Sequence, residues 1–170
     1  MAECKVICTD SGEEFRFAKD AELLERVKEE VEDGLKHTLS YYKDKIPSAS
    51  HYAQLKTDRT LSGYVDFRPT EGAISPSSIS FDCTPDTCAI EGEFVLKGKK
   101  TERKKEDLII PGFPHQCELT NIHLHEGEGA WIKEAETHVH FACVAWPTEV
   151  KEIVTRMITL MGEGKVKFKE

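Results

Sequence analysis

The stretch DAELLERVKEEVEDGLKHTLSYYKDKI, residues 20–46, decides the class of fold. Its apolar side chains recur at intervals of three and four residues, a period that predicts an amphipathic helix with one buried face. Asp20 is expected to cap this helix and Pro47 to end it. Gly34 in the interior costs about 1 kcal/mol relative to Ala, which indicates a bend or a close neighbour there. The stripe consists of Leu24, Val27, Val31, Leu35, Leu39, Tyr42 and Ile46.

A second helical stripe follows Pro147, a residue suited to the first turn of a helix. Gly162 is expected to end this helix, and KVKFK at residues 165–169 to form a short last strand. The apolar members of the stripe are Val150, Ile153, Val154, Met157, Leu160 and Met161.

Most of the remaining sequence alternates in the manner of strands. Gly92 lies inside one of these runs and indicates a bulge. Residues 46–63 look irregular, and residues 4–17, CKVICTDSGEEFRF, are predicted to form a hairpin around Asp-Ser-Gly. The predicted strands are GYVDF at 63–67, SSISFDC at 77–83, CAIEGEFVLK at 88–97, a region opened by LIIPGFPHQC at 108–117, and the two arms of a hairpin at 122–141.

These elements predict a single α+β domain over residues 1–170, with a mainly antiparallel sheet backed by two amphipathic helices. The strands follow one another without helical crossovers, which argues against a parallel doubly wound sheet. The glycine-rich EGEGA at residues 126–130 lies between two strands. It therefore lacks the helix that a phosphate-binding glycine loop requires.

The composition limits the classes of partner. A formal net charge of -8 argues against a general affinity for DNA or RNA backbones, which reward clustered Lys and Arg. No run approaches the length of a membrane span, and the N-terminal residues lack a secretory signal pattern. We therefore expect a soluble, cytoplasmic protein that does not enter membranes.

The chain contains six cysteines, and without a signal sequence we expect free thiols. Cys83 and Cys88 flank a short turn, so a crosslink is geometrically possible if the compartment is oxidising. Cys143 is expected in the core, whereas Cys117 remains a candidate for thiolate chemistry. Cys83 and Cys88 with His115 and Cys117 could instead form a Cys-rich zinc site. The cysteines are Cys4, Cys8, Cys83, Cys88, Cys117 and Cys143.

Four of the seven histidines lie in the hairpin NIHLHEGEGAWIKEAETHVHF, residues 121–141. Residues two apart on a strand share a face, so His123 projects with His125, and His138 with His140. The alternating positions on both arms are apolar, which places the histidines on the polar face. If the arms pair, opposed Cβ atoms are roughly 4.5 to 5.5 Å apart and the two pairs converge.

Converging imidazoles predict a metal site, with His123, His125, His138 and His140 as ligands and zinc as the expected metal. His115 and Cys117 extend this donor row if the strand is regular. Three histidines with an open position would support hydrolysis or hydration of a small substrate. Glu126, Glu134 and Glu136 are close enough in sequence to ligate, to orient an imidazole or to act as general base, and Glu136 is the predicted catalytic residue.

The His-x-His spacing is similar to the strand-borne zinc site of α-carbonic anhydrases, where such a pair is completed by a histidine on the neighbouring strand. The similarity is confined to this hairpin, so no activity is carried over from that family.

Three other interpretations stay open. The histidines could form a solvated strand face, or a surface that responds to protonation between about pH 5 and 8. The protein could instead be a non-catalytic module that binds another protein through a sheet face, the helix at residues 20–46 or the lysine-rich residues 97–107. Trp131 and Trp146 are most simply explained by core or helix packing.

Overall fold

The structure is a computed structural model, which describes the backbone of residues 4–46, 49–57, 59–67, 78–97, 105–125 and 136–168. Within these ranges, the side chains of residues 4–18, 67, 97, 105, 124, 125 and 136 are not described. The main elements are α1 (Cys4–Tyr41), β1 (Ala49–Leu55), β2 (Leu61–Phe67), β3 (Ser78–Cys83), β4 (Cys88–Lys97), β5 (Leu108–Ile109), β6 (Cys117–His125), β7 (Glu136–Ala145), α2 (Val150–Gly162) and β8 (Lys167–Phe168), with short 3-10 turns η1 (Lys105–Asp107) and η2 (Pro147–Glu149).

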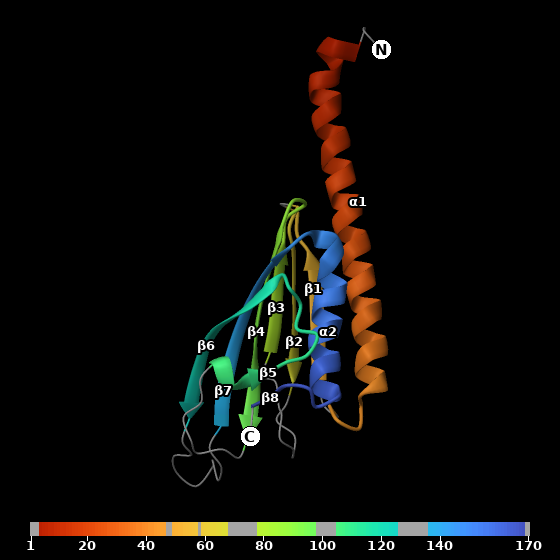
Figure 1. Cartoon of the computed structure of the whole chain (residues 1–170). Coiled ribbons are helices and arrows are strands. Elements are labelled where there is room, and N and C mark those ends of the chain that lie inside the picture. Colours follow the sequence, from red (N-terminus) through yellow and green to blue (C-terminus); the bar gives the residue numbers. More distant parts are fainter. Residues whose placement is uncertain are drawn as a thin grey trace.

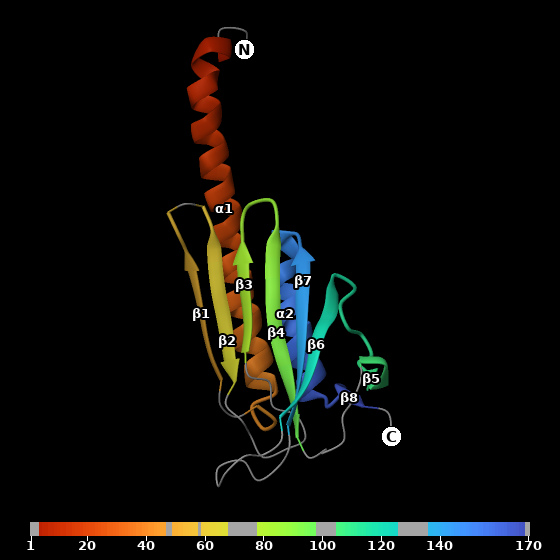
Figure 2. The same ribbon diagram turned by 90° about the vertical axis from the view of Figure 1, so that its left-hand side faces the viewer.

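Six strands form an antiparallel sheet in the order β1-β2-β3-β4-β7-β6, and β5 pairs with β8 in a separate two-stranded sheet. Both helices cover the same face of the large sheet, with α1 packed against α2 and β1 (Figures 1 and 2). The opposite face carries no helix of the described chain. This architecture confirms the predicted α+β fold with two helices behind an antiparallel sheet.

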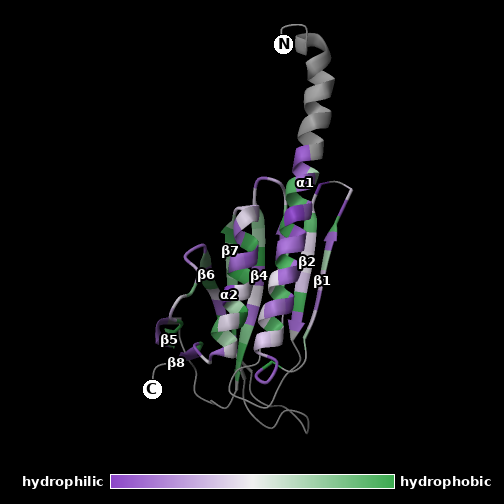
Figure 3. Cartoon of the chain, turned by 90° about the vertical axis from the view of Figure 1, so that its right-hand side faces the viewer, coloured by the Kyte–Doolittle hydropathy of each residue, from purple (hydrophilic) through white to green (hydrophobic). Residues whose placement is uncertain are grey.

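The core lies between the helices and the sheet. The predicted helical stripes supply one side of it, because Leu24, Val31 and Leu35 of α1 and Met157 of α2 are fully buried. Strand residues supply the other side, with Phe94 stacked on Phe141 at a ring distance of 5.0 Å. Over residues 19–41, the side of α1 turned away from the sheet is mostly hydrophilic (Figure 3).

The two helices approach closely at Gly34. A Cβ there would lie 3.1 Å from Lys151 Cγ and 3.2 Å from Thr155 Cγ2, so the close neighbour expected at this glycine is α2. At the far ends of the helices, the Tyr42 hydroxyl donates a hydrogen bond of 2.9 Å to Glu163 Oε1. These contacts fix α1 and α2 side by side.

The N-terminal part of the chain differs from the prediction. Residues 4–17 belong to α1 and not to a hairpin, and α1 extends beyond the end of the sheet (Figure 1). A helix that already exists grows by one hydrogen bond per residue, whereas an isolated two-stranded hairpin is marginal in water. Asp20 therefore lies inside the helix and does not cap it, and its Oδ2 lies 3.3 Å from Arg59 Nη1.

Two strand predictions also change. Residues 49–55, expected to be irregular, form β1. Most of its residues are exposed, so apolar and polar residues alternate only weakly along it. Gly92 is not in a bulge, because the pairing of β4 with β7 runs through it without a shift and the pairing with β3 reaches it in register. Its role is a close approach, since a Cβ would lie 2.6 Å from Phe141 Cζ and 2.9 Å from the Ser78 carbonyl oxygen.

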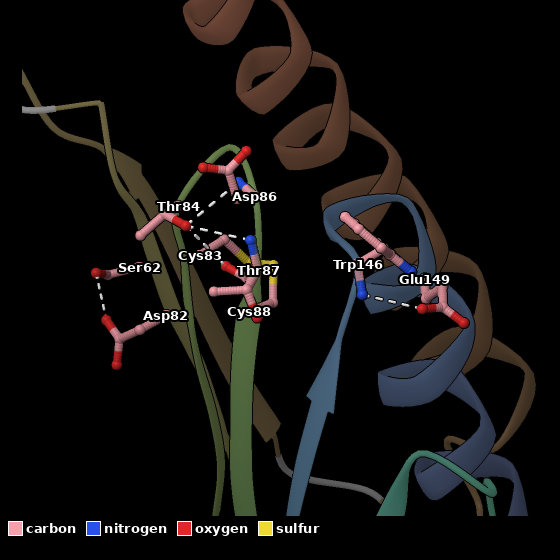
Figure 4. Close-up of a disulfide and its surroundings, with 9 residues drawn as sticks. All are labelled: Ser62, Asp82, Cys83, Thr84, Asp86, Thr87, Cys88, Trp146 and Glu149. Carbon is pink, nitrogen blue, oxygen red and sulfur yellow. Dashed lines mark hydrogen bonds between the residues drawn. A yellow bond between two sulfur atoms is a disulfide. The ribbon is translucent and has the colours of Figure 1, made fainter.

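The expectation of free thiols is wrong for four cysteines. Cys83 and Cys88 lie opposite each other on β3 and β4 and form a disulfide, as do Cys117 and Cys143 on β6 and β7. Figure 4 shows the first disulfide beneath its turn, where Thr84 Oγ1 accepts a hydrogen bond of 3.2 Å from the Thr87 N–H. Pairing in register brings the sulfur atoms together, which sequence spacing could not establish for Cys117 and Cys143.

None of the helices in the described residues combines the length and apolar character needed to cross a membrane.

Candidate functional site

The predicted histidine hairpin exists as the β6–β7 pair. His123 lies directly opposite His138, Asn121 opposite His140, and His125 opposite Glu136. The structure therefore brings His123, His138 and His140 to one region on the outer face of the sheet. The side chains of His125 and Glu136, and residues 126–135 between the strands, lie outside the described set.

A bulge decides which face the histidines occupy. The β6–β7 register shifts between Leu119 and Asn121, leaving Thr120 as the extra residue. Before the bulge, Cys117 packs at the core, and after it the core position is taken by Ile122. The expected donor row of His115, Cys117 and His123 is therefore wrong, because an extra residue exchanges the faces of a strand.

The neighbouring strand β4 adds a carboxylate that sequence reasoning missed. Glu93 pairs with His140 across β4 and β7. Glu93 Oε2 lies 3.3 Å from His138 Nδ1 and 3.6 Å from His140 Nε2, so both rings converge on one oxygen atom. The His123 and His140 rings meet edge to face, with centroids 5.3 Å apart. Three strands thus contribute to one cluster.

The cluster is partly shielded from solvent. The exposed fractions of the side chains are 18 % for Glu93, 20 % for His138 and 39 % for His140. Val95 is buried although it lies on the same face as Glu93, directly opposite His138. An ionic contact in such a setting is screened less by water than a fully exposed one.

An open hollow of 720 Å³ adjoins the cluster on the outer face of the sheet. His123, His140 and Glu93 reach it from β6, β7 and β4. Its lining is rich in hydroxyl, amide and carboxylate groups, which suits a small polar ligand better than an apolar one. The other polar members of the lining are Ser78, Ser80, Glu91, Thr120 and Asn121.

Imidazole nitrogen and carboxylate oxygen are the donors that zinc accepts from protein side chains, so the cluster has suitable chemistry. Among the side chains that the structure describes, however, no three His, Cys, Asp or Glu residues are already arranged around one metal position. His138, His140 and Glu93 are the nearest approach to such an arrangement, and the side chain of the predicted ligand His125 is not among those described.

The Cys-rich alternatives fail because Cys83, Cys88, Cys117 and Cys143 are all in disulfides and offer no thiolate. Most of the lysine-rich residues 97–107 lie outside the described set, as does Trp131, so those predictions stay predictions. Trp146 is exposed rather than packed in the core.

A second polar hollow, of 400 Å³, lies where β6 begins beside α2. Glu149 accepts hydrogen bonds from the Trp146 N–H at 2.9 Å and from Gln116 Nε2 at 2.6 Å. The Trp146 N–H, followed by the Gln116 amide, lowers the pKa of the Glu149 carboxyl below its usual range. Because both carboxylate oxygens are engaged, this residue ties η2 to the start of β6.

Comparisons of the chain with protein-family models, with curated proteins and with solved structures found no match. The chemistry of the histidine cluster is therefore the ground on which a function can be assigned.

Proposed function

We propose that the protein binds a transition metal ion, zinc in the first instance, on the outer face of its sheet. His138, His140 and Glu93 are the principal ligands, and the fourth position is taken either by His123 or His125 or by a water molecule. The observation that carries this proposal is the convergence of two imidazole nitrogens on a single carboxylate oxygen.

The spacing of the donor atoms supports this assignment. Zinc binds nitrogen and oxygen at about 2.0 to 2.2 Å in a tetrahedron, which separates neighbouring donor atoms by about 3.4 Å. The Glu93 oxygen is 3.3 Å from one histidine nitrogen and 3.6 Å from the other. A rotation of the half-exposed His140 ring would close the set around one ion at small cost.

The hollow beside the cluster favours a catalytic use of the metal. With three protein ligands, the fourth position would face the hollow lined by Glu91 and Asn121. Zinc there would lower the pKa of a bound water towards about 7 and supply hydroxide for hydrolysis or hydration of a small polar substrate. Glu136 opposite His125 remains the predicted general base. The alternative is a non-catalytic module that binds another protein.

The cytoplasmic location stays a prediction. The two disulfides weigh against it, because disulfides persist mainly in oxidising compartments.

The test is the metal content of untagged protein, measured by inductively coupled plasma mass spectrometry after dialysis against zinc. We expect about one equivalent of zinc, lost in a His138→Ala/His140→Ala variant. His37→Ala/His115→Ala is the matched control, because it removes two exposed histidines outside the cluster. It should keep the metal. Equal zinc content in both variants, with unchanged circular dichroism, would sink the proposal.

A further inference from the structure

The two edges of the large sheet differ in how they are protected. In the described chain, β6 and β1 each pair with one neighbour only. The β6 edge carries the bulge at Thr120 and the acidic residue Glu118, both of which discourage a further strand from adding. The β1 edge has neither device. It pairs with β2 over all seven residues without a shift, and its sequence, ASHYAQL, contains no Pro, Asp, Glu, Lys or Arg.

The β1 strand is also accessible. Five of its seven residues are exposed, and Figures 2 and 3 show it lying outside α1 at the margin of the sheet. Tyr52 and Tyr64 are 48 % and 41 % exposed, and their ring centroids lie 5.8 Å apart on the outer face. A strand edge offers unpaired backbone donors and acceptors, so an accessible and unprotected one is ready to pair.

We propose that β1 is a self-association edge, at which two copies of this chain pair antiparallel about a two-fold axis through Tyr52. Tyr52 is the central residue of the strand, so the pairing is self-complementary. Ser50 would face Gln54 of the second copy, and His51 would face Ala53 of the second copy. The two sheets would join into one continuous sheet.

A second copy is the occupant that the exposed tyrosine pair favours. The chain has a formal net charge of -8, and acidic residues such as Glu91, Glu93 and Asp82 occupy the outer face of the sheet. Two copies therefore repel each other over most approaches, and this repulsion is weaker at β1, which contains no Asp, Glu, Lys or Arg. Tyr52 and Tyr64 of both copies would form a ladder of four rings across the junction, a favourable cross-strand arrangement.

Pairing through one seven-residue strand makes a small interface, so the dimer should be reversible and concentration-dependent. Sedimentation velocity of the full chain, from micromolar to near-millimolar concentration, measures this directly. We expect the weight-average sedimentation coefficient of the unmodified protein to rise from a monomer value towards a dimer value.

Two charge variants identify the edge. Tyr52→Lys and Tyr52→Glu each place like charges directly opposite one another across the two-fold axis, so each should stay monomeric on its own. An equimolar mixture should recover a mixed dimer, because Lys then faces Glu. Glu118→Lys, on the β6 edge, is the control and should associate as the unmodified protein does. Circular dichroism checks that every variant is folded.

A monomer at every concentration overturns the proposal and leaves β1 to an extended segment of another protein. Association that persists in Tyr52→Lys alone also overturns it, because the contact would then lie elsewhere. Both results are independent of metal binding, since β1 contributes nothing to the histidine cluster.

Discussion

His123 of β6 lies directly opposite His138 of β7, and His123 points away from the core because one extra residue, Thr120, interrupts β6. The part of β6 before the bulge is tied to β7 by the Cys117–Cys143 disulfide. The bulge therefore places His123 on the outer face, and the disulfide fixes the register of β6 just before the bulge.

Deletion of Thr120 should remove the bulge and turn His123 towards the core. Because the disulfide holds Cys117 in register, the residues after the deletion change face, which buries polar imidazole and exposes Ile122. We expect a loss of more than about 2 kcal/mol in the free energy of unfolding, measured by urea denaturation. Thr120→Ala keeps the residue count and should change it little. Equal stabilities of the two variants would contradict this account of the bulge.

Glu93→Gln should weaken zinc binding about 10- to 100-fold in isothermal titration calorimetry, because the amide no longer supplies a negative charge beside two imidazoles. Glu91→Gln changes the same strand face and lines the same hollow. It should bind zinc as the unmodified protein does, since no contact joins Glu91 to His138 or His140 among the described interactions. Equal losses in both variants would point to a general effect of charge.

Gly92→Ala should destabilise the fold by about 1 to 3 kcal/mol, because its methyl group would collide with the ring of Phe141 and with the Ser78 carbonyl. Gly34→Ala is the matched control. Its methyl group would lie 3.1 Å from Lys151 Cγ and 3.2 Å from Thr155 Cγ2, contacts that a shift of a few tenths of an ångström relieves, and Ala is favoured over Gly in a helix by about 1 kcal/mol. Thermal denaturation should therefore separate the two variants clearly, and similar melting temperatures would argue against the close approach at Gly92.

Removal of the Cys117–Cys143 disulfide should cost more than removal of Cys83–Cys88. The first closes a loop with a sequence separation of 26 and the second one of only 5. Loop-closure entropy gives about 3.5 and 2 kcal/mol respectively. Cys117→Ala/Cys143→Ala and Cys83→Ala/Cys88→Ala, compared by urea denaturation, test this order. More than two free thiols per native chain, counted with a thiol reagent, would contradict the disulfides themselves, because Cys4 and Cys8 belong to neither of the two.

Glu149→Ala should lower the free energy of unfolding by about 1 to 2 kcal/mol at neutral pH. The Trp146 backbone N–H and the Gln116 side-chain amide would both lose their acceptor. The pKa of Glu149 is lowered from its ordinary value of 4.5, so the native state favours the charged form. This stabilisation is complete above the ordinary value and disappears as the pH falls through the lower native value. The difference between variant and parent should therefore shrink in acid. The exposed Glu152→Ala is the control and should show no such pH dependence.

The helices could be predicted in their essentials because their period is local. The apolar positions from Leu24 to Ile46 and from Val150 to Met161 match the buried residues, with few exceptions at the margins. The start of α1 could not be predicted, because alternation in a short N-terminal stretch competes with the continuation of a neighbouring helix. The edge strand β1 was missed because exposure on both faces removes the alternation by which strands are recognised.

The histidine cluster could be predicted only in part. Because His138 and His140 are two residues apart on a strand, the sequence predicted that they share a face. It also predicted that the two arms of the hairpin pair. The sequence places Glu93 on the same strand face as Glu91, but no local pattern in the sequence indicates that β4 lies beside β7. The sheet order brings Glu93 to the histidines from 45 residues away.

The sequence by itself determined the two helical stripes, the antiparallel character of the sheet and the shared face of each His-x-His pair. These properties depend on residues a few positions apart. Only the tertiary structure decided that β4 lies beside β7 in the sheet, that Thr120 forms a bulge and that Cys117 meets Cys143. Such contacts depend on which segments pair, and this choice is settled by packing the whole core at once, not by any local pattern.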